Sequence, residues 1–105
     1  MTGPAWTPSG GGGASELPVT SQTTSFTADI TDCVVLCSGP SPFTVTLPTA
    51  AGNAGKFFII KNVGSQVITV DANGAQTIDG LANYILPIQY DAVQVLSDGA
   101  NWVVV

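Results

Sequence analysis

Seven carboxylates are the residues most able to do chemistry in this 105-residue sequence: Glu16, Asp29, Asp32, Asp71, Asp79, Asp91 and Asp98. A glycosidase needs two carboxyl groups that flank one bond at about 5–9.5 Å, and the spacing of these acids permits such a pair. Turn formation accounts for three of them equally well. Asp79 and Asp98 each precede a glycine, and Asp71 opens the run Asp-Ala-Asn-Gly. We therefore expect turn residues, and we expect no catalytic residues and no enzyme.

Other kinds of site lack a necessary residue. A triad built on Ser or Cys needs a base, and without any His the only substitute is Lys. Two thiols do not make the four ligands of a zinc site, and the twelve-residue calcium loop ending in Glu is missing around Asp71, Asn73 and Asp79. The glycine run 10–13 lacks the Lys of a phosphate-binding loop. The sequence predicts no metal and no cofactor.

The two cysteines, Cys33 and Cys37, are four positions apart. On one strand they would face the same side with Cα atoms about 13 Å apart, at ~3.3 Å per residue. A disulfide needs a Cα separation of roughly 4.4–6.8 Å, so a bridge would require a sharp bend in that strand. We therefore expect two free, buried thiols that act as small hydrophobic side chains.

The sequence carries unusually little charge. Charged residues make up 9% of it, against about 25% in an average soluble domain, while the apolar share of 45% is ordinary. Either the chain is a soluble domain with an uncharged surface, or much of that surface is covered by other subunits; we favour the second interpretation. With Lys56 and Lys61 as its only basic residues and a net charge of −5, the chain is not expected to bind nucleic acid or acidic membranes.

No targeting signal is visible in the sequence. It contains neither the ~18–20 apolar residues of a membrane span nor a basic segment followed by an apolar one, as in a secretory signal. We therefore expect no membrane association and synthesis in a cytoplasm.

From Thr23 onward the sequence is typical of β-structure. Short runs rich in Val, Ile, Thr and Phe alternate with turn residues, a pattern that predicts one all-β domain over residues 23–105. We expect a small antiparallel β-sandwich, jelly-roll-like, or a barrel. The expected strands are 24–28, 30–36, 43–47, 56–62, 66–70, 76–78, 83–88, 91–97 and 100–105.

Several local features refine that prediction. Phe43, Val45 and Leu47 should point inward, and 66–70 should pair back onto 56–62. Residues 49–55 have the only helical potential, a single turn around 50–51. Pro87 marks an edge strand or a bulge. Asp98-Gly99 predicts a hairpin closed by a type I′ turn.

Residues 1–22 differ from the rest and form a predicted N-terminal arm. They combine prolines, a run of four glycines and a single aromatic residue, Trp6. Such a composition cannot bury enough apolar surface to fold alone. We expect an extended arm that reaches a neighbouring subunit, with packing back onto its own domain as the alternative. The expected contact residues are Trp6, Pro8, Gly10, Gly11 and Leu17.

Two stretches carry a family resemblance. The first is Phe43-Thr-Val-Thr-Leu-Pro, followed by Gly55-Lys-Phe-Phe-Ile-Ile-Lys-Asn, Val67-Ile-Thr-Val and Gln76-Thr-Ile-Asp-Gly; the second is Val93-Gln-Val-Leu-Ser-Asp-Gly-Ala-Asn-Trp. Together they resemble small β modules of tailed-bacteriophage virion proteins, which occur in capsid decoration proteins, head fibres and tail-fibre tips. The resemblance covers about the last sixty residues and not the arm.

The resemblance implies a homotrimer whose apolar flanks are buried against two neighbours. The residues expected at that interface are Phe58, Ile60, Trp102 and Val104. Because a fibre tip usually follows a long shaft and only about twenty residues precede this β domain, we expect a capsid cement or decoration protein. It would bind the major capsid protein on the outer surface of the virion.

The alternative is a short head- or tail-fibre module that recognises carbohydrate on the host surface. Such a module would expose aromatic side chains, for which the candidates are Trp6, Tyr84, Tyr90 and Trp102. For Trp102, packing in the core or in an interface is the better interpretation. A third possibility, a glycan-cleaving enzyme, would require a carboxylate pair clustered in a cleft.

Overall fold

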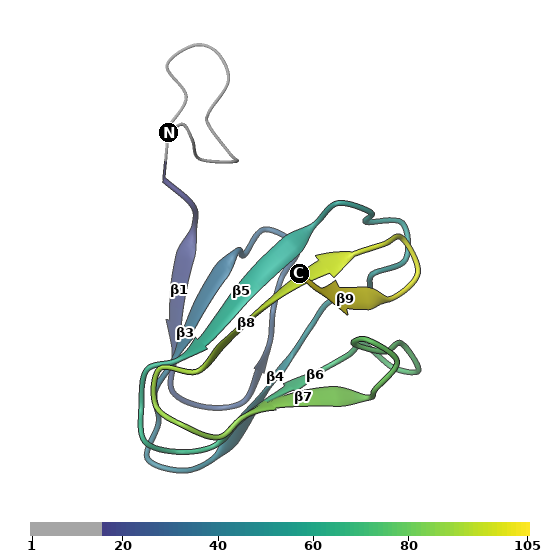
Figure 1. Ribbon diagram of the computed structural model, residues 1–105. Coiled ribbons are helices and arrows are strands. Elements are labelled where there is room, and N and C mark those ends of the chain that lie inside the picture. Colours follow the sequence, from purple (N-terminus) through teal and green to yellow (C-terminus); the bar gives the residue numbers. More distant parts are fainter. Residues whose placement is uncertain (1–15) are drawn as a thin grey trace.

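The computed structural model describes residues 16–105, which form two facing β-sheets and contain no helix (Figure 1). No helix in this part of the chain is therefore long and apolar enough to cross a membrane. The strands are β1 (Val19–Gln22), β2 (Phe26–Thr27), β3 (Val34–Cys37), β4 (Phe43–Thr46), β5 (Phe57–Asn62), β6 (Ile68–Asp71), β7 (Asn83–Leu86), β8 (Ala92–Ser97) and β9 (Trp102–Val104).

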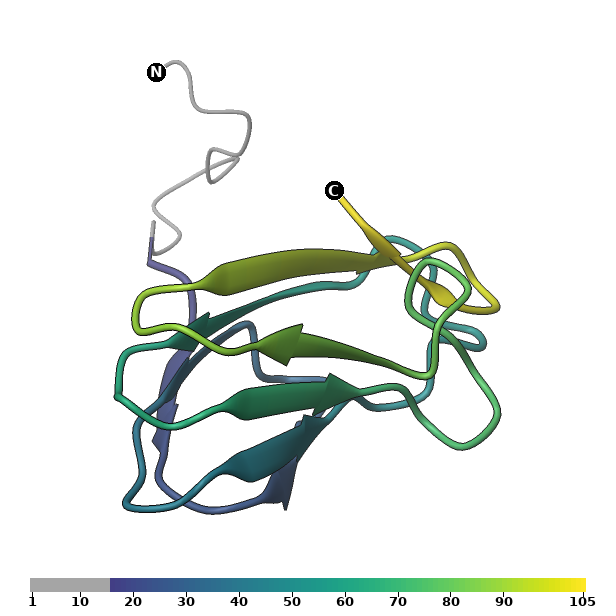
Figure 2. The same cartoon turned by 60° about the horizontal axis from the view of Figure 1, so that its bottom comes forward.

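The sheets are open layers. The five-stranded sheet has the order β1-β3-β5-β8-β9, and the four-stranded sheet has the order β2-β4-β6-β7 (Figure 2). The predicted all-β class is confirmed. The alternative of a barrel is wrong, because the two sheets do not close on each other by strand pairing.

The first six strands wind between the two layers, so neighbours within each sheet are parallel. β1, β3 and β5 pair in parallel in one sheet, and β2, β4 and β6 in the other. Only the pairs β5–β8, β6–β7 and β8–β9 are antiparallel. The expected antiparallel sandwich is therefore wrong for the first six strands.

The physical reason lies in the connections. After β5 the chain crosses to the opposite sheet through 63–67, so β6 pairs with β4 and does not pair back onto β5. In each sheet, paired residues on two neighbouring parallel strands are 25 positions apart in the sequence. Val34 pairs with Ile59 in one sheet, and Phe43 pairs with Ile68 in the other. Pro87 follows β7, which is an edge strand as the sequence predicted.

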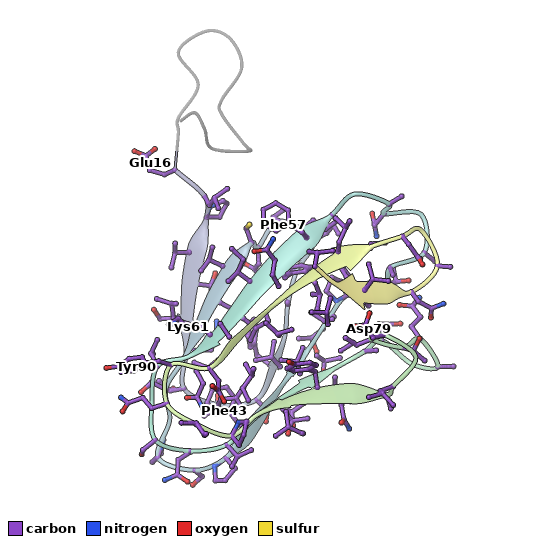
Figure 3. The ribbon with its side chains drawn as sticks, in the orientation of Figure 1. Glu16, Phe43, Phe57, Lys61, Asp79 and Tyr90 are labelled. Atoms are coloured by element: carbon purple, nitrogen blue, oxygen red, sulfur yellow. The ribbon has the colours of Figure 1, made fainter. Side chains whose placement is uncertain are left out.

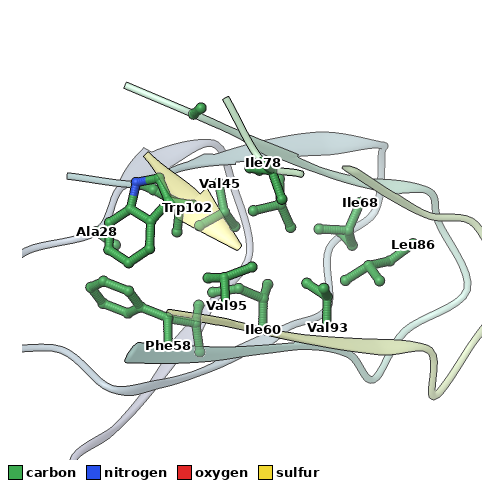
Figure 4. Packing of buried hydrophobic residues seen from close by; sticks show 14 of the residues in the cluster. Ala28, Val45, Phe58, Ile60, Ile68, Ile78, Leu86, Val93, Val95 and Trp102 are labelled. Carbon is green, nitrogen blue, oxygen red and sulfur yellow. The ribbon is translucent and has the colours of Figure 1, made fainter. Parts of the chain in front are cut away.

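Side chains that alternate along the strands fill the space between the sheets. Phe43, Val45 and Leu47 are buried as predicted, with half-exposed threonines between them. The largest buried side chains, Phe58 and Trp102, meet edge to face with ring centroids 5.6 Å apart (Figure 4). This aromatic pair belongs to a single continuous core.

Three of the four residues expected at a subunit interface belong to that core. Phe58, Ile60 and Trp102 have no exposed surface, because the pleat directs them between the sheets. They are not available to a neighbouring chain, and the expectation is wrong for them. Val104 is partly buried and packs against the same core.

Two buried polar side chains tie the layers together. Asn62 on β5 donates its amide hydrogens to the carbonyls of Gln66 (2.8 Å) and Leu86 (3.0 Å) and accepts the N–H of Gly64 (3.0 Å). Its bond to Leu86 joins the five-stranded sheet to the four-stranded one. At the other end, the hydroxyl of Ser97 on β8 donates to the carbonyl of Ala50 (2.8 Å), in the connection that leads from β4 to β5.

The turns differ in detail from the prediction. Residues 49–55 form two successive turns in place of a helical one, since the carbonyls of Ala50 and Asn53 accept bonds from residues three positions on. Residues 76–78 are not a strand, although Ile78 makes isolated bridges to Leu81 and Trp102.

The C-terminal hairpin is confirmed, but its turn is longer than predicted. Ser97 pairs with Trp102, so four residues form the loop instead of two. Of the two central residues of a type I′ turn, only Gly99 has a positive φ, at 99°. The carboxylate of Asp98 accepts N–H bonds from Ala100 and Asn101 and stabilises this wider loop.

The boundary of the arm also moves. Val19–Gln22, which the sequence placed in the arm, forms β1 and pairs with Val34–Cys37, so these four residues belong to the β domain. Leu17 is half-buried. Trp6, Pro8, Gly10 and Gly11 lie outside the described residues.

Replacing Asn62 tests the tie between the sheets. In Asn62→Ala the partners Gly64, Gln66 and Leu86 lose their hydrogen bonds, and we expect a loss of about 2–4 kcal/mol in the free energy of unfolding. Asn83→Ala, at an exposed position, should change it by less than ~0.5 kcal/mol. Urea denaturation of both variants provides the measurement, and equal losses would contradict the assigned role of Asn62.

Candidate assembly surface

Five carboxylates of the described chain accept hydrogen bonds from backbone N–H groups: those of Asp29, Asp32, Asp79, Asp91 and Asp98. Asp79 accepts the N–H of Val104 (3.0 Å), Asp32 that of Asp29 (2.8 Å), and Asp91 that of Ile88 (3.2 Å). Within residues 16–105, no group of three Cys, Asp or Glu side chains is placed to hold a metal ion. These acids thus stabilise turns and strand ends, which is the role the sequence predicted for Asp79 and Asp98.

Two of the acids have perturbed pKa values for the same reason. The backbone N–H of Thr31, followed by its hydroxyl, lowers the pKa of Asp29. The backbone N–H groups of Asn101 and then Ala100 lower the pKa of Asp98. A carboxylate that accepts such bonds favours its charged form, which fits a structural role in the loop.

Both cysteines are buried free thiols, as predicted. Burial raises the pKa of Cys37 to about 11. Burial also raises the pKa of Cys33, and the positive charge of Lys56 partly opposes that shift. Neither thiol is poised as a nucleophile, because the thiolate is disfavoured at neutral pH.

Charge is segregated between the two ends of the sandwich. Connections at one end, here called the acidic end, carry Asp29, Asp32, Asp79 and Asp98, and Asp71 ends β6 there. The other end, here called the crossing end, consists of the connections 23–25, 38–42, 63–67 and 87–91 that pass from one sheet to the other. Its only charged groups are Asp91 and, at the end of β5, Lys61. Figure 3 shows Asp79 and Tyr90 at these opposite ends.

The crossing end contains a shallow groove. Residues 23–25 and 40–43 enclose a volume of about 410 Å³, near the lower limit of ligand pockets. Its walls present hydroxyl groups and two proline rings, with Phe43 beneath them and no charged side chain. Such a lining suits an uncharged ligand, because it offers no partner for a charge.

The largest departure from a normal surface is segment 81–90. Nine of its ten residues are exposed, and none of the ten is charged. Its exposed side chains include Leu81 (64% exposed), Ile85 (45%), Ile88 (66%) and Tyr90 (63%). Isolated exposed apolar residues are ordinary, but an uncharged run of them is a candidate surface for contact with another molecule.

Segment 81–90 also contains an open sheet edge. β7 is the outer strand of its sheet, and no strand of the described chain pairs with its outer side (Figures 1 and 2). The edge of β9 is different. Trp102 and Thr77–Asp79 exchange two backbone bonds, and the Asp79 carboxylate takes the N–H of Val104. The fold covers one edge with its own chain and leaves β7 without charged gatekeepers.

The loop after β7 holds an aromatic side chain out toward solvent. Tyr90 has a φ of 74°, a region that costs a bulky residue conformational energy. Lys61 Nζ donates to the Tyr90 carbonyl (3.0 Å) and lies 5.8 Å from the ring centroid, while the Tyr90 N–H bonds to the Asn62 carbonyl. The fold thus stabilises a strained backbone whose ring remains mostly exposed.

The aromatic candidates for sugar binding therefore differ in their accessibility to solvent. Trp102 is buried and unavailable, whereas Tyr84 (38% exposed) and Tyr90 are accessible. Trp6 lies outside the described residues. Sequence reasoning missed segment 81–90 as a surface, although one signal was present: Asp79 and Asp91 flank a long run without any charge.

No family model and no curated protein matches the sequence.

The thiol of Cys37 should make stability depend on alkaline pH. Its folded pKa of about 11 lies above its ordinary value of 9.0, so the unfolded chain loses the proton first. The contribution of the Cys37 thiol to the free energy of unfolding is fully present below pH 9. It is lost as pH rises toward 11, by at most about 1.4 kcal/mol per pH unit. Urea denaturation across this range should show a shallower decline in Cys37→Ala. Identical slopes in the two proteins would contradict the assignment.

Proposed function

We propose that this chain is a structural protein of a tailed-bacteriophage virion, a cement or decoration protein that binds the outer capsid surface as a homotrimer and stabilises the shell. The observation that carries the proposal is the exposed, uncharged segment 81–90. The family resemblance supplies the virion setting. In this proposal the β domains associate, and the N-terminal arms contact the major capsid protein.

Segment 81–90 is physically suited to contact between copies of the chain. Each chain carries a net charge of −5, so copies repel one another wherever their acids approach. Of the seven acids only Asp91 lies at the crossing end, and segment 81–90 itself has none. Burying the exposed parts of Leu81, Ile85 and Ile88 would contribute on the order of 4 kcal/mol per copy to the free energy of association. This stabilisation favours association through that segment.

Cementing follows from multivalency. Three arms on one trimer turn weak individual contacts into firm attachment, because the second and third contacts form at high effective concentration. A protein that binds the assembled shell and not its separated subunits stabilises the shell by mass action. The proposal thus requires no chemical step.

A second candidate function is recognition of host-surface carbohydrate by a short head- or tail-fibre module. The specific observation in its favour is the exposed ring of Tyr90 at the same end of the molecule as an uncharged groove. Aromatic rings and hydroxyl groups are suited to neutral sugars. Binding to host cells without binding to capsids would favour this candidate over the cement function.

A charge placed within segment 81–90 should prevent association. Ile85→Glu puts a carboxylate on the open strand, where three copies would bring like charges together without solvent. We expect the trimer to dissociate to monomers that keep the folded β-structure, with a melting temperature lowered by the loss of association. Gln94→Glu makes a charged substitution at an exposed position of β8, on the other sheet, and should remain trimeric. Light scattering after gel filtration distinguishes the outcomes, and a trimeric Ile85→Glu variant would contradict the proposed interface.

Removal of residues 1–15 should separate folding from attachment. The deletion leaves β1 and segment 81–90 intact, so we expect a folded β domain that still forms the trimer through that segment. Binding to undecorated capsids, measured by co-sedimentation, should be lost. The variant Glu16→Ala, which changes the adjacent exposed residue and keeps the arm, should bind as the full chain does. Retained binding after the deletion would show that the arm does not attach the protein.

A further inference from the structure

We propose that the groove at the crossing end receives residues 4–8 of the arm of a neighbouring copy, with Trp6 as the anchor. The inference rests on the association of copies in the proposed function. It assigns the arm a second binding partner besides the capsid. Arms that occupy grooves on other copies would link the proteins to one another across the shell.

The two walls of this groove are held in fixed positions by the fold. A Cβ at Gly39 would lie 2.3 Å from the Thr23 carbonyl and 3.1 Å from the Phe43 ring, so only glycine lets the two connections approach so closely. The hydroxyl of Ser25 accepts the N–H of Thr44 (3.0 Å) and fixes the other wall to β4. The groove is therefore formed before any ligand binds, which lowers the ordering cost of binding.

The chemistry of the groove matches that of the arm. The groove offers hydroxyl groups, the rings of Pro40 and Pro42, and Phe43 below, with no charged side chain. Residues 1–15 carry no charged side chain either, and 4–8 read Pro-Ala-Trp-Thr-Pro. Proline-rich segments bind grooves lined by rings because they lose little entropy on binding. A charged peptide would lose its hydration there without gaining a partner.

The position of the arm favours a neighbour's groove over its own. Figure 3 shows Glu16, where the described chain begins, at the end opposite Phe43. β1 runs from there toward the groove, so an arm that reached its own groove would have to reverse and cross its own domain. Trp6 precedes Glu16 by ten positions, which gives a maximal reach of roughly 33–36 Å. That reach is sufficient for a groove on an adjacent copy in a head-to-tail arrangement.

The two tryptophans make the contact measurable in the full-length protein. Trp102 has no exposed surface, so it is a constant background, measured alone in Trp6→Phe. We expect acrylamide to quench Trp6 weakly in the full chain at high protein concentration. Ser41→Arg, which places a bulky cation in the groove, should increase Trp6 quenching several-fold. Ser65→Arg, at another exposed serine on the connection 63–67 outside the groove, should leave the quenching unchanged.

Dilution of the protein distinguishes a neighbour's arm from the arm of the same chain as the occupant of the groove. If a neighbour's arm fills the groove, quenching of Trp6 in the full chain should increase as the protein is diluted. Strong quenching at every concentration, or no response to Ser41→Arg, would overturn the inference. Shielding that persists at all dilutions would instead assign the groove to the arm of the same chain and would also overturn it. Since no capsid is present, this result is independent of whether the protein cements capsids.

Discussion

The hydrogen bonds of two buried polar side chains hold this sandwich together. Asn62 connects the sheets at the crossing end, and Ser97 connects β8 to the β4–β5 connection at the other end. A buried amide or hydroxyl left without partners is costly, so both residues restrict how the layers can slide or separate. Phe58 and Trp102 pack edge to face in the core that the two layers enclose.

With the apolar residues of both inner faces enclosed, function is confined to the outside. There the chain distributes its few charges unevenly, with most acids at one end and an uncharged groove at the other. It covers the edge of β9 with residues 77–79 and leaves the edge of β7 open beside exposed apolar side chains. These features are consistent with a protein whose outer strand is covered in its working state, as the proposed function requires.

The sequence was sufficient to predict the β class, the inward face of β4, the free cysteines and the terminal hairpin, because each depends on short-range patterns. It was insufficient for the topology. Turn residues such as those at 62–65 look alike whether the chain returns to its own sheet or crosses to the other. For the same reason Phe58, Ile60 and Trp102 were assigned to an interface: an apolar strand position does not reveal whether the second layer comes from the same chain. Segment 81–90 was overlooked as a surface because exposure depends on the edge position of β7 in the folded sheet.

The most direct test of this account is hydrogen–deuterium exchange of the β7 amides in the unmodified full-length protein, measured over a range of protein concentrations. If other copies cover segment 81–90, the exchange of these amides should slow several-fold as concentration rises, while the amides of the exposed turn residues Gly74 and Ala75 exchange at a constant rate. Exchange of β7 that stays the same at every concentration would contradict the central claim that copies of the chain meet at this strand.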